Sequence, residues 1–176
     1  MGYSAEWAEI FELRNRVRFR VFLLAAMLML WLGLRSSAWA SVHQYPEGAD
    51  RVMYRSLQTL RDRTDQAWQL VLFKRLKAGQ TESIHLRLVG FPGAVEFKHP
   101  APLRISGSDR GWVAADSLAE NSLFPANVGE YDVLQPLTEA STSRVLQLFL
   151  PTTAGDIELI VPSAVMQEWR QVAAFN

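Results

Sequence analysis

The chain has 176 residues, with 18 basic and 18 acidic side chains, and it contains no cysteine. The lack of cysteine excludes disulfides, thiolate metal sites, a thiol nucleophile and a lipid-modified cysteine. Removal of residues 1–40 leaves 13 basic against 15 acidic side chains, a charge of minus two. A basic domain that binds nucleic acid is therefore excluded.

The first forty residues have the pattern of a signal peptide. Four arginines between positions 14 and 20 precede an apolar run of fourteen residues, 21–34. Ala38 and Ala40 then supply the small residues that a signal peptidase reads. We expect cleavage between Ala40 and Ser41, which removes residues 1–40. The rest of the chain would then act outside the cytoplasm.

An uncleaved anchor is the main alternative to cleavage. A spanning helix needs about 20 apolar residues, and the run here is shorter, which favours cleavage. The segment before the apolar run, residues 1–20, is long for a signal peptide and contains three glutamates. A translation start near Val17 would give a compact signal peptide. No paired arginine supports a twin-arginine route.

Residues 41–50 are polar and contain Pro46 and Gly48, so we expect a flexible arm. Residues 51–176 are expected to form a single β-rich globular domain. Its first part alternates apolar and polar residues in three stretches that short turns separate, which predicts an antiparallel meander. The three strands are predicted at 52–62, 67–77 and 81–89, with 67–77 central and its first half covered on both sides.

The second part of the chain has shorter periodic segments. A helix opening at Pro162 or Ser163 places four apolar residues at helical spacing, so one of its faces should pack on the sheet. The predicted fold class is α+β and β-rich: a mostly antiparallel sheet, flat or curled into a half-barrel, covered by the C-terminal helix. The other expected elements are strands at 95–98, 102–105, 112–114, 144–150 and 156–161, helical turns at 117–120 and 134–140, and a loop at 121–130.

No constellation in the sequence specifies a catalytic, cofactor or metal site. A zinc site would need three or four converging ligands, and the available set is His85, Glu96 and His99, which no local spacing brings together. A serine hydrolase would need an activated nucleophile, and the nucleophile-elbow motif is missing. We therefore predict no catalytic residue, no metal and no cofactor.

Three aromatic residues lie in polar or loop-like stretches. Trp112, Phe124 and Tyr131 are near Pro and Gly, where exposed aromatics often serve partner docking. The more ordinary interpretation, which we favour about twofold, is that they cover the open side of the sheet. They remain the candidate docking residues.

The chain resembles a known family over nearly all of residues 43–172. The resemblance is carried by HQYPEGADRVMYRSLQTLRD, AWQLVLFKR, LRLVGFPG, FPANVGEYD and VPSAVMQEWR. These stretches are similar to a small exported cyanobacterial family catalogued as a domain of unknown function. The resemblance implies a protein of the periplasm or the thylakoid lumen, with an accessory role near the photosynthetic membrane. It contains no catalytic motif and carries no site residues across.

We predict an exported, non-catalytic accessory or binding protein that docks on a membrane complex or another exported protein. It would bind no nucleic acid and have no membrane span after cleavage. The first alternative is a carrier of a small apolar or amphipathic ligand inside a curled sheet. A hydrolase using His85 is the weakest alternative. The sequence leaves the partner, the ligand and the oligomeric state open.

Overall fold

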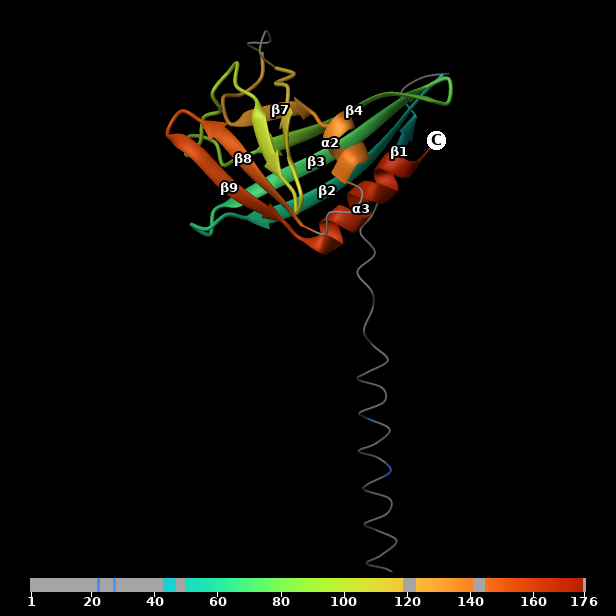
Figure 1. Cartoon of the computed structure of the whole chain (residues 1–176), viewed down its shortest axis with the longest axis horizontal. Helices are drawn as coiled ribbons and strands as arrows, with labels where there is room; N and C mark the ends of the chain where they lie inside the picture. The colour runs from blue at the N-terminus through green and yellow to red at the C-terminus, as the bar shows by residue number, and fades with distance from the viewer. Residues whose placement is uncertain are drawn as a thin grey trace, which may run out of the picture. The chain divides into compact units, whose positions relative to one another are not determined.

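The computed structural model of the chain describes residues 43–46, 50–118, 123–140 and 145–175, together with Phe22 and Met27. The chain divides into two units, Met1–Trp39 and Ala40–Asn176. The second unit contains strands β1 to β9 (Figure 1). The predicted cleavage site at Ala38, Ala40 and Ser41 lies outside the described residues, as does most of the apolar run. Within the described part of the chain, no helix has both the length and the apolar character that crossing a membrane requires.

Five antiparallel strands form the first sheet, sheet A, in the order β1-β2-β3-β4-β7. The predicted three-stranded meander is confirmed as β2, β3 and β4, and β3 is the central strand. Asp62 organises the β2–β3 turn, because its Oδ1 accepts hydrogen bonds from the backbone amides of Thr64 and Gln66. The strands are β1 (His43–Pro46), β2 (Arg51–Arg61), β3 (Ala67–Lys77), β4 (Gln80–Val89) and β7 (Val128–Asp132).

Four antiparallel strands form the second sheet, sheet B, in the order β6-β5-β8-β9. They are β5 (Leu103–Ser106), β6 (Gly111–Ala114), β8 (Leu146–Thr152) and β9 (Gly155–Val161). The described helices of this unit are α2 (Leu134–Glu139) and α3 (Ser163–Ala174). The prediction of a β-rich α+β fold with antiparallel strands and a C-terminal helix is confirmed, although the strands form two sheets.

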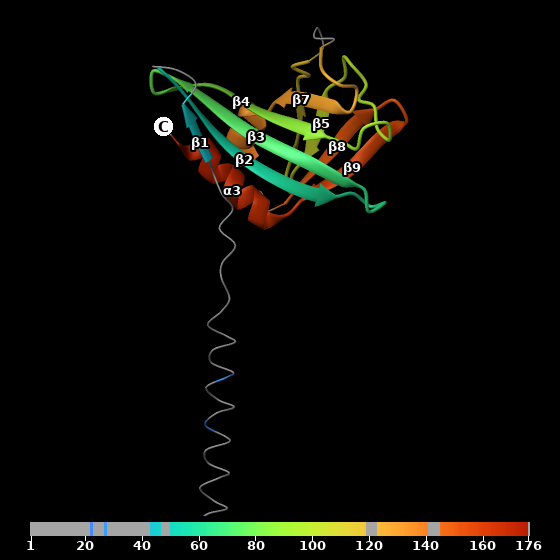
Figure 2. The same ribbon diagram turned by 180° about the vertical axis from the view of Figure 1, so that it is seen from behind.

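One core lies between the inner faces of the sheets and the helices. Trp68, Leu70 and Leu72 of β3 are completely buried, and they share a cluster of buried residues with Leu103 and Leu148 of sheet B. The prediction that the first half of β3 is covered on both sides holds only in part. On its outward side Ala67 and Gln69 are exposed and Val71 is half-buried, whereas Phe73 is 4 % exposed. No helix packs over this side in the described part of the chain (Figure 2).

Helix α3 packs on β2 and β3 through the face that its spacing predicted. Val165, Met166, Trp169 and Val172 are all buried. Burial of four large apolar side chains stabilises the docked helix by several kcal/mol, at roughly 1.5–3 kcal/mol each. Glu168 lies on the same face, where its Oε2 accepts a hydrogen bond from Nε2 of Gln58 at 2.6 Å.

A buried lysine closes the end of α3. Lys74 is 2 % exposed, and its Nζ donates to the backbone oxygens of Ala173 and Phe175, at 2.7 and 2.6 Å. The ring of Phe175 stacks on Tyr54 of β2. Carbonyls at a helix C-terminus lack intrahelical donors and carry partial negative charge, which favours a cation there. Burial lowers the pKa of Lys74.

Three expectations about local structure are corrected. The arm predicted at 41–50 contains strand β1, which pairs with β2 along its whole length. The loop predicted at 121–130 contains the start of β7, which pairs with β4. The strand predicted at 95–98 is reduced to an isolated bridge between Phe97 and Thr152. In each case tertiary pairing, which local composition does not encode, decides the outcome.

Candidate functional site

The three aromatic residues predicted for docking are not an exposed group. Trp112 is 9 % exposed, and its Nε1 donates to Oε2 of Glu139 at 3.0 Å. Tyr131 is completely buried beside Phe97. The strand register gives the reason, because Trp112 lies opposite the inward residue Ile105. The expectation of exposed docking side chains is corrected for these two residues.

The third aromatic residue, Phe124, is half-buried. The Cζ atom of Arg87 lies 5.3 Å from the centroid of its ring. Burial, followed by the charge of Asp116, raises the pKa of the Tyr131 hydroxyl. Of the three predicted docking residues, only Phe124 is therefore partly exposed at the surface. Its contact residue Arg87 belongs to a different candidate site, on the outer face of sheet A.

The residues considered for zinc are not brought together. His85 Nδ1 lies 3.3 Å from Glu130 Oε1, and His99 Nδ1 lies 2.6 Å from Asp116 Oδ2. Each histidine thus pairs with its own carboxylate. No group of three or more potential ligands is found among the described residues.

A serine, a histidine and a glutamate do meet at one point, but not as a catalytic triad. Ser117 Oγ lies 3.2 Å from His85 Nδ1, the same nitrogen that Glu130 approaches. A triad needs the serine on one ring nitrogen and the carboxylate on the other, so that a proton can pass through the ring. This geometry does not activate Ser117.

The outer face of sheet A carries an arrangement of arginines over aromatic rings that we name the arginine face. Its central ring is Phe73, which is only 4 % exposed although it points away from the core. The Cζ atoms of Arg75 and Arg87 lie 4.9 and 5.6 Å from its centroid. His85 stacks on the same ring at 5.5 Å. We define the arginine face as Arg55, Phe73, Arg75, His85 and Arg87.

Strand register builds this face. Arg55 of β2 and His85 of β4 both lie directly opposite Phe73. Directly opposed side chains on one face of a sheet are about 5 Å apart at Cβ, so they cover each other. Guanidinium groups are attracted to the negative face of an aromatic ring and stack on it.

Glu130 at the β7 edge supplies a negative charge to the arginine face. Its Oε2 accepts a hydrogen bond from Nε of Arg87 at 2.8 Å, and the same oxygen lies 2.6 Å from Nη2 of Arg87 in an ion pair. Burial alone would raise the pKa of Glu130. The hydrogen bonds from His85 and Arg87, with their charges, outweigh burial and lower the pKa. Glu130 is therefore held ionised and fixes the position of Arg87.

Strand β1 extends the arginine face at the opposite edge of sheet A. The Cζ atom of Arg55 lies 4.8 Å from the centroid of Tyr45, and Arg55 Nη2 donates to the Tyr45 hydroxyl at 3.1 Å. The acceptor is a hydroxyl rather than a carboxylate, so this contact orients the guanidinium without forming an ion pair. Figure 2 views the outer face of sheet A, and in that view the helices lie behind the sheet.

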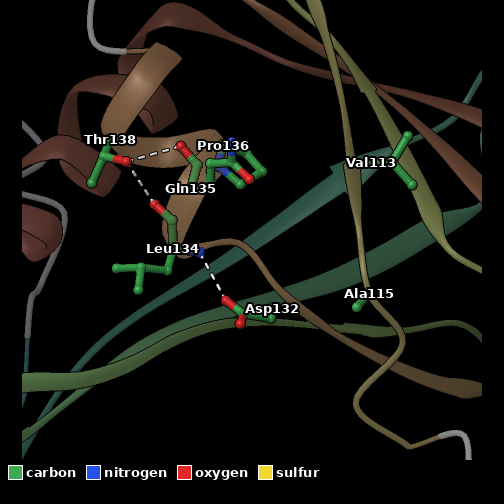
Figure 3. A pocket seen from close by; sticks show the side chains of 7 residues that line it. All are labelled: Val113, Ala115, Asp132, Leu134, Gln135, Pro136 and Thr138. Carbon is green, nitrogen blue, oxygen red and sulfur yellow. Dashed lines mark hydrogen bonds between the residues drawn. The ribbon is translucent and has the colours of Figure 1, made fainter.

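A groove of about 420 Å³ opens between β6 and α2 (Figure 3). Asp132 and Thr138 line it, but both are engaged locally. Asp132 Oδ1 accepts a hydrogen bond from the Leu134 amide, and Thr138 Oγ1 donates to the backbone oxygens of Leu134 and Gln135. Both side chains thus have hydrogen-bond partners within the chain. Its lining residues are Val113, Ala115, Asp132, Leu134, Gln135, Pro136 and Thr138.

The arginine face was missed because no single segment contains it. In the third predicted strand, His85 and Arg87 alternate with apolar residues, so their outward position could be predicted. The neighbouring positions on the other strands could have been found only by aligning the three predicted strands through their turns. That alignment places Arg55 beside Phe73.

The fold and the site describe a β-rich domain of two antiparallel sheets, one of which has a cationic and aromatic face that no described helix covers. The chain belongs to a family described as a protein of unknown function (DUF3122), whose model matches residues 40–172. The resemblance to a domain of unknown function is confirmed in this respect, and its cyanobacterial origin stays a prediction. No curated protein and no solved structure matches the chain.

Proposed function

We propose that the protein is an exported, non-catalytic accessory protein of the periplasm or the thylakoid lumen. It docks on a membrane complex or on another exported protein. The charged lead, the apolar run and the small residues before Ser41 support export. The arginine face supports docking, and it replaces the surface first expected around Trp112 and Tyr131.

One observation carries the docking proposal: an aromatic ring and three arginines are arranged on a sheet face that no described helix covers. Arginine and aromatic residues are enriched at protein interfaces and among the residues that dominate binding energy. Stacking already restricts the arginine side chains, so less conformational entropy is lost when a partner binds. The neighbouring Leu57 adds an apolar side chain that is 49 % exposed.

Neither alternative function gains a comparable observation. A carrier needs an internal cavity, whereas Trp68, Leu70 and Leu148 fill the space between the sheets. A hydrolase needs an activated nucleophile, and Ser117 is placed on the wrong nitrogen of His85.

Site-specific photo-crosslinking in the native cells tests this proposal. A photoreactive phenylalanine derivative replaces Leu57 on the outer face of sheet A. The same derivative replaces Ile160 on the outer face of sheet B as a matched control, since the two side chains are 49 and 47 % exposed. We expect a discrete crosslinked partner from Leu57 and none from Ile160, as identified by mass spectrometry.

The same samples report on export. The intact mass of the recovered protein gives its N-terminus, which we expect at Ser41. A crosslink from Ile160 with none from Leu57 would place the interface on sheet B and contradict the proposal. Equal labelling from both positions would indicate non-specific contact and contradict it as well. Recovery of the whole chain from the cytoplasm would contradict export.

A further inference from the structure

Two neighbouring turns of the domain expose large apolar side chains. Phe91, in the turn that follows β4, is 68 % exposed, and Leu123, in the segment that leads into β7, is 90 % exposed. Both segments lie at the end of the domain away from α3 (Figure 1, Figure 2). We name residues 90–94 and 123–128 the apolar tips.

Hydrogen bonds tie the two apolar tips together. The Gly90 amide donates to the backbone oxygen of Asn127 at 3.0 Å. Nδ2 of Asn127 returns a hydrogen bond to the Gly90 oxygen at 2.8 Å. Within the first tip, the Ala94 amide closes the turn by donating to the Phe91 oxygen at 3.1 Å. The tips are therefore held in place before they meet any partner.

Internal pairing also lowers the cost of moving the apolar tips out of water. A backbone polar group that leaves water without a partner costs free energy, so apolar surroundings accept a turn whose polar groups are paired internally. In the second tip, the Pro125 oxygen accepts from the Val128 amide at 3.0 Å. The Ala126 oxygen accepts from the Phe97 amide at 2.7 Å. Pro92 and Pro125 have no backbone N–H that would need a partner.

The exposed surface of the apolar tips is free of charge. Their sequences are GFPGA and LFPANV, which contain no charged side chain. The one polar side chain in them, Asn127, is 8 % exposed and is used within the domain. Exposed apolar patches mark contacts with proteins or with membranes. A protein interface usually adds arginine and a polar rim to its aromatic residues. The apolar tips lack these groups, which favours lipid.

The size of the apolar tips also favours a bilayer over a protein. A phenylalanine side chain covers roughly 150–250 Å², and a leucine side chain is smaller. A stable protein interface buries about 1,200–2,000 Å² in total, so two such side chains are too few to hold a partner protein by themselves. A bilayer requires no matching surface, because apolar side chains enter its acyl boundary directly.

We propose that the apolar tips insert into the surface of a lipid bilayer. Phe91 and Leu123 enter the acyl boundary, and the hydrogen-bonded turns behind them lie at the level of the headgroups. The insertion is shallow and reversible, since two apolar side chains are less than a stable anchor needs. This inference goes beyond the proposed function. It concerns lipid and uses no residue of the arginine face, so either proposal can fail without the other.

Site-specific fluorescence with the full chain tests the inference. The chain has no cysteine, and Ala126 is exposed in the second tip, so Ala126→Cys carries a single NBD label while Phe91 and Leu123 stay in place. The probe is a vesicle of uncharged phosphatidylcholine that contains lipids spin-labelled on their acyl chains. We expect NBD emission to shift to shorter wavelength and to be quenched. Both signals should persist at about 1 M salt, where surface charges are screened.

The matched control carries the label at Ile160→Cys. Ile160 is 47 % exposed and lies just before α3, so it reports membrane contact elsewhere on the domain, including contact that residues 1–40 bring about. We expect neither signal there. In the Ala126→Cys protein, the added changes Phe91→Ser and Leu123→Ser should abolish both signals. Circular dichroism should be unchanged, because both replaced side chains are exposed.

The opposite results would overturn the inference. Signals at Ala126 that survive the loss of Phe91 and Leu123 would show that the apolar tips do not drive insertion. Equal quenching at Ala126 and Ile160 would indicate non-specific adsorption. Absence of quenching at Ala126 would exclude lipid, and a photoreactive group at Phe91 that crosslinks a protein in the native cells would then assign the tips to a protein partner. None of these results bears on the crosslink from Leu57, which tests the proposed function separately.

Discussion

The outer faces of the two sheets share a local motif but differ in how their charges are balanced. On sheet A, guanidinium groups stack on Phe73 and Tyr45. On sheet B, Arg104 stacks on Phe149 in the same way. However, Arg104 also forms an ion pair with Asp156, at 2.5 Å between its Nη2 and Oδ2.

The neighbouring carboxylate of sheet B is also engaged, since Glu158 on β9 pairs with Arg63 at 2.8 Å. Sheet B therefore places its counter-charges inside the strand array, whereas sheet A places them at its ends and at the β7 edge. The comparison teaches that, among the described residues, the two faces share the stacking of arginine on aromatic rings and differ in where their carboxylates lie.

Removal of the central ring should break the comparison most strongly. Phe73→Ala deletes a ring that is 4 % exposed and supports two guanidinium groups and an imidazole. We expect a loss of about 3 kcal/mol in the free energy of unfolding, at the low end for buried Phe→Ala changes. Urea denaturation measures this loss. The control Phe149→Ala, at a half-buried ring, should lose about half as much, and equal losses would contradict the account.

A change in β7 should have the next largest effect. A Cβ atom at Gly129 would lie 2.8 Å from Cδ1 of Phe97 and 2.9 Å from Cε2 of Tyr131. Gly129→Ala therefore overpacks the core beneath Glu130 and should cost about 2 kcal/mol of stability. Thermal unfolding measures the effect.

A glycine on an edge strand of sheet B provides the control for Gly129. At Gly111 of β6, the nearest atom to an added Cβ is the backbone oxygen of Ile105, at 3.3 Å. Gly111→Ala should cost less than about 1 kcal/mol, because a small shift relieves the contact. A Gly129 variant that is as stable as the Gly111 variant would show that β7 is not held against Phe97.

Acidification should weaken the β7 edge of the arginine face. The pKa of Glu130 is lowered in the folded state, so its contribution to stability is fully present above its ordinary pKa of 4.5. That contribution is lost as the pH falls through the folded pKa. The free energy of unfolding should therefore drop less between pH 7 and pH 3 in Glu130→Gln than in the unchanged protein. Parallel pH profiles for the two proteins would refute this linkage.

The smallest expected effect concerns sheet B. Asp156→Asn removes the counter-charge of Arg104, and both side chains are about half exposed. An exposed pair of this kind contributes about 0–1 kcal/mol, so stability should hardly change. Urea denaturation measures the change, and a loss of more than about 2 kcal/mol would contradict the view that this pair is a weak surface contact.

Much of the fold could be predicted because its signals are local. Residues 83–88 alternate strictly, and the four apolar residues of α3 recur at helical spacing. The turn at Asp62 was also predictable, since an aspartate side chain can accept bonds from amides within its own turn. These features depend on side chains within a few positions of one another.

The remaining features depend on partners that are distant in sequence. The segment at β7 contains Gly129 and no alternation, and its strand forms by pairing with β4. The segment at β1 contains Pro46 and forms because β2 offers an edge. The candidate site is of the same kind, since Arg55 and Phe73 become neighbours only through the register of two strands. Burial of Trp112 and Tyr131 likewise follows from strand pairing, because they lie opposite Ile105 and Leu86, which are inward residues of neighbouring strands.

The lysine that closes α3 has a practical consequence for protein engineering. Nζ of Lys74 depends on the carbonyls of Ala173 and Phe175, and Phe175 in turn stacks on Tyr54. A shortened chain that ended before residue 173 would leave an ammonium group inside the protein without these acceptors, a costly arrangement. A purification tag should therefore follow Phe175 through a flexible spacer, so that the last turn of the helix keeps its place on the sheet.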